Sequence, residues 1–306
     1  MSKLAYYIVV YPLSLLPMTL LYRISDILYL TFRTIVPYRK VVITNNLERS
    51  FPQMSKSEIR QIRFKFYRHF CDLLMEGVKN LSISKNELKK RLVVTNPQLM
   101  NELFDKNKSV LLLGGHYCNW EWLITSQNTL FQHEAYGIGK KLTSKYWDKK
   151  LNERRERFGM HVINNKNYKE VLENNEHECK AILVLTDQSP GSSIRSYWTK
   201  FLHQNTAVLF GAEMLAHELN YSVVYFRMKK LKRGYYELSL ELITESPRTM
   251  QWGKITKAHV ERLEEQIILQ PELWLWSHKR WKREVPKDLE SLKVEQNENF
   301  NKRYGY

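Results

Sequence analysis

The spacing of hydrophobic residues along the chain changes near Ser109. Before this position, apolar residues recur at the three- and four-residue steps of a helix, as at Ile59, Ile62 and Phe66. The sequence Ser55-x-x-Glu58 precedes them and is typical of a capping box at the start of a helix. After Ser109, short apolar runs alternate with amphipathic segments. The pattern predicts a helical lead-in followed by an α/β domain.

The region after Ser109 contains several segments with the composition of strands. These strand segments are residues 110–113, 135–139, 181–185, 222–227 and 235–243. Helices are predicted from Asn119 onward and over residues 143–158, 206–219 and 255–269. Because strands and helices alternate, we expect an α/β fold with a mostly parallel central sheet flanked by helices. The expected organisation is a lead-in over 41–108, a core over 109–284 and a loose polar tail over 285–306.

The N-terminal region is apolar, but its prolines are unfavourable in a membrane-spanning helix. Residues 4–22 carry no charged side chain but contain Pro12 and Pro17, and a second apolar run follows over residues 27–32. Several of its residues are tyrosines, which favour the boundary between lipid headgroups and water. We interpret residues 4–37 as helices that insert into a membrane or lie on it, so that residues 1–40 form an anchoring segment. The alternative is a pair of buried core helices.

The net charge of the chain limits the kinds of partner that it is expected to bind. The 306 residues include 48 Lys and Arg against 32 Asp and Glu, a formal net charge of +16. Such a chain is attracted to anionic surfaces, which include nucleic acid, an anionic bilayer and an acidic protein. The apolar N-terminus favours an anionic membrane surface, and the absence of a nucleic-acid-binding motif disfavours DNA or RNA. The three cysteines are widely spaced and indicate neither a disulfide framework nor a thiolate zinc site.

Polar residues follow three of the predicted strands directly. His116 follows the first strand, Lys140 the second, and Asp187 and Gln188 the third. In an open α/β sheet, ligands bind beyond the carboxyl ends of the strands. We therefore expect a histidine, a lysine and a carboxylate at one edge of the sheet.

The segment around His116 has the pattern H-x4-E. Gly114 and Gly115 precede the histidine, and Glu121 lies in the first turn of the helix that Asn119 is expected to cap. From that position Glu121 can reach one imidazole nitrogen and leave the other to accept a proton. The natural use of such a pair is to deprotonate a substrate hydroxyl. The spacing does not suit zinc, a P-loop is absent, and Cys118 is expected to fill space.

At this point the sequence resembles a known family. The stretch from Gly114 to Trp122 is similar to the H-x4-[DE] motif of the glycerolipid acyltransferase-like superfamily. The wider pattern is similar to the late acyltransferases of bacterial lipid A biosynthesis, the HtrB-like lauroyl and myristoyl transferases. Further matching segments are residues 11–13, 46–52, 66–69, 157–159, 186–190, 211–213, 232–236 and 271–282.

The resemblance implies an acyltransferase at the cytoplasmic face of the inner membrane. It would move a fatty acyl chain from an acyl carrier protein thioester to a hydroxyl of a membrane lipid, most simply a lipid A precursor. His116 would be the base and Glu121 its charge partner. Lys140, at a position where the family usually has arginine, would help Asp187 and Gln188 to bind substrate or stabilise the transition state. The mechanism requires neither a metal nor a cofactor.

Several alternatives remain open from the sequence. The acceptor can instead be a lysophospholipid, an amino-acid lipid or a glycolipid, and the donor can be a coenzyme A thioester. A protein of another class, a membrane lipid-binding protein without catalysis, is also compatible with the charge and the anchor. The acyl chain length and the oligomeric state are not determined.

Overall fold

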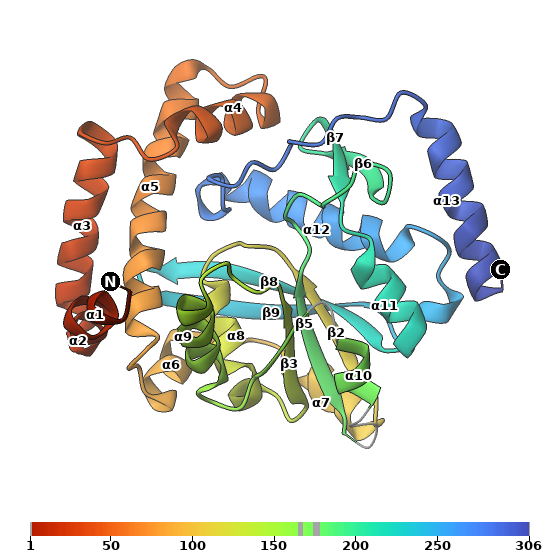
Figure 1. The fold of residues 1–306 in the computed structure, drawn as a ribbon, viewed down its shortest axis with the longest axis horizontal. Helices are drawn as coiled ribbons and strands as arrows, with labels where there is room; N and C mark the ends of the chain where they lie inside the picture. Colours follow the sequence, from red (N-terminus) through yellow and green to blue (C-terminus); the bar gives the residue numbers. More distant parts are fainter. Residues whose placement is uncertain (1, 165–167, 174–177, 306) are drawn as a thin grey trace.

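The computed structural model describes residues 2–164, 168–173 and 178–305, and it confirms the α/β fold. Its central sheet has seven strands in the order β1-β9-β8-β2-β5-β3-β4 (Figure 1). The strands are β1 (Leu92–Val94), β2 (Val110–Gly114), β3 (Glu134–Gly139), β4 (His161–Asn164), β5 (Lys180–Leu185), β8 (Ser222–Lys232) and β9 (Tyr235–Thr244). Among these neighbours, only β8 and β9 are antiparallel.

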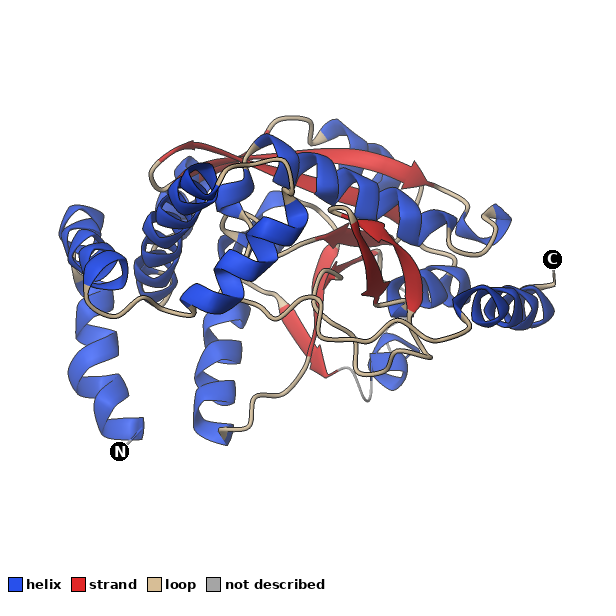
Figure 2. Cartoon of the chain, turned by 90° about the horizontal axis from the view of Figure 1, so that it is seen from above, coloured by secondary structure: helices blue, strands red, loops and turns tan. Residues whose placement is uncertain are grey.

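Helices cover both faces of the sheet (Figure 2). They are α7 (Gln98–Asp105), α8 (Trp120–Leu130), α9 (Lys145–Glu156), α10 (Tyr168–Glu173), α11 (Gly211–Leu219) and α12 (Lys254–Leu269). Strand β2 shows why both faces need cover, because Leu112 packs in one hydrophobic cluster and Leu111 and Leu113 in another. A parallel strand buried on both faces leaves only its carboxyl end available for polar chemistry.

The N-terminal region is helical. It contains α1 (Ser2–Ala5), a π-helical turn (Tyr6–Val10), α2 (Tyr11–Leu15), α3 (Met18–Thr34), α4 (Lys40–Ser50), α5 (Lys56–Lys79) and α6 (Lys85–Arg91). The chain bends by 120° between residues 3–15 and α3. In the described residues no single helix meets the length and hydropathy of a membrane span, whereas this bent pair meets them together.

Helix α3 has two different faces. It lies along α5 at the outer edge of the molecule, and its Leu21 and Tyr29 are buried there (Figure 1). On its other face Leu20, Ile27 and Leu30 are 49%, 64% and 55% exposed. The buried-helix interpretation therefore describes one face of α3, and the apolar outer face is left for another partner.

Helix α5 joins the N-terminal region to the sheet. The predicted capping box is confirmed, since Ser55 and Glu58 bond each other's backbone N–H groups. Further along, Glu76 is fully buried and accepts hydrogen bonds from Tyr22, Asn119 and Tyr236. Burial raises the pKa of Glu76 to about 7. This carboxyl group links α3, the start of α8 and β9.

Two predicted segments differ in the structure. The expected helix over 206–219 begins only at Gly211, because Gln204–Val208 forms β7, which pairs antiparallel with β6 (Tyr197–Phe201). The tail is not loose: Leu289–Tyr304 forms α13, capped by Asp288. Phe300 anchors this helix, since it is buried against the rings of Phe210 and His217.

Candidate active site

The parallel pairing of β2 with β5 brings His116 and Asp187 together. The register runs from Val110 opposite Ala181 to Gly114 opposite Leu185, so each residue lies two positions beyond its strand. The Nδ1 atom of His116 is 2.6 Å from Oδ1 of Asp187. The backbone N–H of His116 donates to Oδ2 of the same carboxylate at 2.9 Å.

Asp187 is held as an anion. Its residue is only 6% exposed, and Trp274 donates its indole N–H to Oδ2 at 2.7 Å. Burial alone raises the pKa of this carboxyl, but His116 and the hydrogen bonds from His116 and Trp274 outweigh burial and lower the pKa of Asp187 to about 2. An ionised Asp187 accepts the Nδ1 proton of His116, which leaves Nε2 with a lone pair for proton abstraction.

The Nε2 atom of His116 faces a polar group and an aromatic edge. The side-chain amide nitrogen of Gln188 lies 3.2 Å from it, and the Trp120 ring meets the imidazole edge-on at a centroid distance of 5.0 Å. The His116 side chain is 15% exposed. Gln188 therefore contacts the base nitrogen itself, and an incoming hydroxyl can take the place of its amide.

Close packing around the two glycines fixes the loop that carries His116. A Cβ atom on Gly114 would lie 2.2 Å from the Phe226 ring, and one on Gly115 would lie 2.8 Å from Leu263. Side chains at these positions would push the loop off the sheet. The Leu275 N–H also donates to the His116 carbonyl at 3.2 Å, so the segment after α12 braces the loop from the other side.

Glu121 does not contact His116, and the predicted partnership is corrected here. Helix α8 is capped by Asn119 as expected, with Glu121 in its first turn. From there the carboxylate turns toward α9, where Arg154 Nη2 lies at 2.6 Å and Arg155 Nε at 3.1 Å. Two guanidinium groups occupy the Glu121 oxygens, while Asp187 already occupies Nδ1 of His116.

The ion pairs of Glu121 are partly shielded from water. The side chains of Glu121, Arg154 and Arg155 are 19%, 14% and 20% exposed. Burial raises the pKa of the Glu121 carboxyl, but the two arginines outweigh burial and lower it to about 2. Glu121 thus fixes the position of two cations beside the site.

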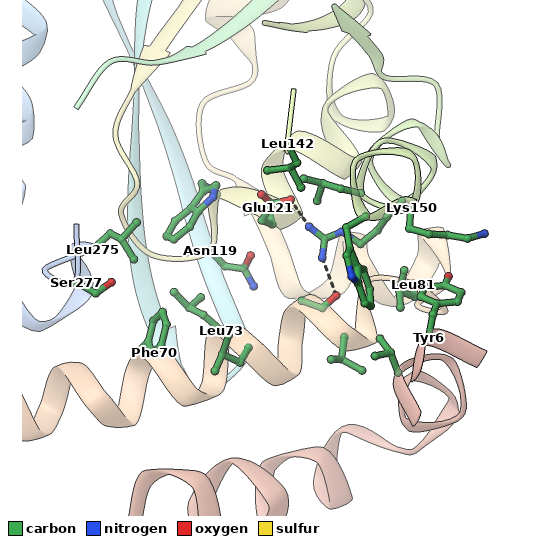
Figure 3. A pocket seen from close by; sticks show the side chains of 18 of the residues that line it. Tyr6, Phe70, Leu73, Leu81, Asn119, Glu121, Leu142, Lys150, Leu275 and Ser277 are labelled. Atoms are coloured by element: carbon green, nitrogen blue, oxygen red, sulfur yellow. Dashed lines mark hydrogen bonds and ion pairs between the residues drawn. The ribbon is translucent and has the colours of Figure 1, made fainter. Parts of the chain in front are cut away.

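An apolar cavity of about 570 Å³ lies next to this site, although His116 itself is not part of its wall. Trp120 and Leu275, which both contact His116, belong to its wall together with Glu121 and Arg154 (Figure 3). Apolar side chains supply most of the remaining wall, including Phe70, Leu73, Leu74, Val78 and Leu81 of α5, Leu142 and Leu151, and Tyr6 and Val10 of the N-terminal region. A long apolar chain would fit beside the imidazole.

Lys140 lies apart from His116, contrary to the expected convergence. It follows β3, which is two strands away from β2, and it is exposed. Lys140 lines a separate polar cavity of about 650 Å³, whose wall also includes Lys141 and Arg155. The expected convergence holds for His116, Asp187 and Gln188 because β2 and β5 are adjacent.

Sequence reasoning did not identify three residues of the site. Trp274 lies in the matching segment 271–282, for which no role of this side chain was predicted, and its indole N–H binds Asp187. Arg154 and Arg155 lie in a helix with many charged residues, and nothing in the sequence except their adjacency distinguishes them from its other charged residues.

Cys118 is fully buried, and burial raises the pKa of its thiol, which makes it a poor nucleophile. The described residues contain no cluster of three or more metal-binding side chains.

Comparison with known protein families gives a match that covers most of the chain. A family model described as bacterial lipid A biosynthesis acyltransferase matches residues 2–283. The match covers the N-terminal helices, His116, Glu121 and Asp187 and ends before α13. A comparison with curated proteins gave no match for this sequence.

Proposed function

The chain belongs to the bacterial lipid A biosynthesis acyltransferase family, and from this premise we propose that it acylates a hydroxyl of a lipid A precursor with an acyl carrier protein thioester as donor. Membership itself establishes an acyltransferase of the lipid A type, with an acyl donor and a lipid acceptor. The identity of the donor, the acceptor hydroxyl and the roles of individual residues are part of the proposal.

The observation that carries the proposal is the His116–Asp187 pair next to an apolar cavity, whose wall includes Trp120 and Leu275, two residues that contact His116. In the proposed reaction, Nε2 of His116 takes the proton of the acceptor hydroxyl as its oxygen attacks the thioester carbonyl. The tetrahedral intermediate collapses by breaking the carbon–sulfur bond, and the imidazolium returns the proton to the departing thiolate. Asp187 stabilises the imidazolium between these steps.

The remaining predicted residues receive supporting roles. Glu121 holds Arg154 at the cavity wall, where its charge can stabilise the negative oxygen of the tetrahedral intermediate. Gln188 gives up its contact with Nε2 when the hydroxyl arrives. Lys140 contributes positive charge to the polar cavity that Arg155 also lines, which suits a phosphorylated part of a substrate.

The volume and lining of the apolar cavity support a fatty acyl substrate. Its volume of about 570 Å³ lies within the usual range of roughly 300–1,000 Å³ for small-molecule sites. Its wall is largely apolar and includes Trp120 and Leu275, which contact His116, so a bound acyl chain could place its thioester carbonyl toward the base.

Members of this family are associated with bacterial membranes. We place this chain on the cytoplasmic face of the inner membrane, where both the carrier protein and the anionic leaflet are available. The exposed apolar face of α3 would enter the lipid, and the net charge of +16 would attract anionic headgroups and an acidic carrier protein.

A donor and acceptor matrix tests the proposal. Purified protein is incubated with an acyl carrier protein thioester or a coenzyme A thioester, and with a lipid A precursor or a lysophospholipid. Mass spectrometry then identifies the product. We expect the lipid A precursor to gain one acyl chain most rapidly from the carrier protein. Transfer only to the lysophospholipid, or consumption of neither thioester, would contradict the proposal.

A further inference from the structure

A small void lies against Asp187 in the core of the molecule. Its volume of about 10 Å³ is near the minimum that holds a single water molecule. Asp187, His259 and Arg280 contribute polar groups to its wall, and apolar side chains supply most of the rest. His116 does not line this void, and the void shares no lining residue with the apolar cavity beside Trp120.

Two deeply buried nitrogen atoms beside this void lack partners. His259 and Arg280 are 1% and 3% exposed. Among the described residues, Nε2 of His259 and Nε of Arg280 have no hydrogen-bond partner. Arg280 uses Nη1 to donate to the Ala207 carbonyl at 2.7 Å. Buried polar atoms are rarely left unsatisfied in folded proteins, so each of these two calls for a partner.

The hydrogen-bonding capacities of these nitrogens are complementary. The Thr186 hydroxyl donates to the Gly114 carbonyl, so it accepts from Nδ1 of His259, 3.3 Å away. Nε2 of His259 is then an acceptor, and burial lowers the pKa of His259 to about 3, which keeps the ring neutral. Nε of Arg280 can only donate. A single water can accept from Arg280 and donate to His259.

The second proton of such a water has a natural acceptor. The Asp187 carboxylate accepts three hydrogen bonds, two from His116 and one from Trp274. A carboxylate offers about four acceptor sites, so one remains. We propose that the void binds one water bridging Arg280, His259 and Asp187, and that Arg280 and His259 are positioning residues acting through Asp187 on His116. The functional part of this inference rests on the proposed acyl transfer.

The bridge would set how strongly Asp187 attracts the proton of the base. A hydrogen bond from the water and the nearby guanidinium both stabilise the carboxylate. Without them, Asp187 stabilises the imidazolium more strongly, and the acid side of the pH–rate profile moves to higher pH. The titratable or charged groups that act on Asp187 come from several elements. They are His116 after β2, Tyr225 of β8, His259 of α12, and His278 and Arg280 after the 3₁₀ turn Pro271–Leu273.

The functional test compares pH–rate profiles of acyl transfer. His259→Phe and Arg280→Met should move the acid-side midpoint upward by roughly 0.5–1 pH unit, and so lower kcat near and below that midpoint, with little change in KM for the donor. Arg280→Lys should stay close to wild type because it keeps the charge. The matched control is Arg63→Met, since Arg63 is also buried with an unpartnered Nε but contacts Thr44.

The control separates structural damage from the proposed role. Arg63→Met should lower the melting temperature without moving the profile. If His259→Phe and Arg280→Met also lower only the melting temperature, the positioning role is overturned. If the wild-type protein shows no transfer, the proposed function fails, and the structural test of the water still decides the site.

That structural test is a high-resolution crystal structure of the wild-type protein. We expect an ordered water within about 3.2 Å of His259 Nε2, Arg280 Nε and an Asp187 oxygen. A direct contact between His259 and Arg280 that closes the void would overturn the proposal, and so would a void without density at that position. This measurement does not depend on the folding of any variant.

Discussion

At the scale of single residues, the proposed mechanism depends on which carboxylate binds the imidazole of His116. Asp187 lies 71 positions after His116 in the chain, yet it binds both Nδ1 and the backbone N–H of that residue. Glu121, only five positions away, binds Arg154 and Arg155 instead. The two carboxylates are ionised for different reasons, so replacing each of them should affect the protein differently.

Replacing Asp187 should weaken the base. In Asp187→Asn the uncharged amide no longer stabilises the imidazolium, so kcat should fall by roughly 10²–10⁴-fold at unchanged donor KM. Steady-state kinetics would measure this fall in kcat, and circular dichroism would check that the variant is folded to the same extent as the wild type. A variant with wild-type kcat would show that Asp187 is not part of the base.

Replacing Glu121 should affect both stability and substrate handling. Glu121→Gln leaves two partly buried guanidinium groups with a neutral partner, and breaking such a pair costs roughly 3–5 kcal/mol in buried sites. The melting temperature should therefore drop, and activity should drop further as Arg154 loses its fixed position. Lys150→Gln is the control because Lys150 lines the same cavity but pairs with Glu153. An unchanged melting temperature for Glu121→Gln would contradict this assignment.

The residues of the site were only partly accessible from sequence. His116, Asp187 and Gln188 were expected together because each follows a strongly apolar strand, and parallel strands present their ends at one edge. The partner of His116 was misassigned, because nearness along the chain was taken for nearness in space. Trp274 could not be assigned, since only the tertiary pairing of its segment with residues 116–118 brings its indole to Asp187.

At the scale of elements, α5 connects the N-terminal helices to the site through Glu76. Its carboxyl group has a pKa of about 7 because it is buried, although hydrogen bonds from Tyr22 and Tyr236 favour ionisation. A carboxyl whose pKa is raised in the folded state stabilises the fold while protonated. That stabilisation is lost as the pH rises from about 4.5 to about 7.

Glu76→Gln should remove this pH dependence. The amide cannot ionise, so the variant should gain stability relative to wild type as the pH rises from 5 to 8, by about 3 kcal/mol at most. Thermal unfolding of both proteins across that range would measure the difference. A difference in melting temperature that stays constant with pH would show that Glu76 does not titrate in this interval.

The N-terminal π-helical turn, which lies in the predicted anchor, is also part of the cavity wall. Tyr6 lines the apolar cavity and packs edge-on against Tyr146 and Trp147. Tyr6→Ala should extend the cavity and shift the preferred donor toward longer acyl chains, measured by competition between donors of different length. Tyr7→Ala is the control, because Tyr7 is 57% exposed. An unchanged preference in Tyr6→Ala would exclude this wall from chain selection.

Elements with a strong apolar signal were predicted well, and those that depend on tertiary pairing were not. Strands β2 and β5 are almost wholly apolar, and each was placed within one residue of its observed bounds. Strand β7 was taken for the start of a helix, because its sequence has no apolar alternation and becomes a strand only by pairing with β6. Helix α13 is polar, and Phe300 is its one buried residue among those that the structure describes.

At the scale of the whole molecule, the exposed apolar face of the N-terminal helices indicates which side of the protein would face a membrane. Exposed apolar side chains lie on α3 and on residues 4–15, on the opposite side from the contacts with α5. Deleting residues 1–37 is expected to release the protein from membranes, but it would also uncover the α5 residues that bury Leu21 and Tyr29. Point substitutions on the outer face are a sharper test.

The triple substitution Leu20→Gln, Ile27→Gln and Leu30→Gln should reduce binding to anionic vesicles by at least about 10-fold, since each inserted aliphatic side chain contributes on the order of 1 kcal/mol. The control is Ile268→Gln with Leu269→Gln, two exposed apolar residues at the end of α12. Vesicle flotation would compare the proteins. Equal binding by the triple variant and wild type would remove α3 from the membrane contact.

The central claim is that the His116 imidazole, held by Asp187, removes the proton of the acceptor hydroxyl. Its most direct test is the rate of acyl transfer by His116→Ala, measured with the donor and acceptor that the wild-type protein uses best. We expect transfer to fall to the background rate, with melting temperature and vesicle binding close to wild type. Wild-type turnover by a folded, membrane-bound His116→Ala protein would contradict it.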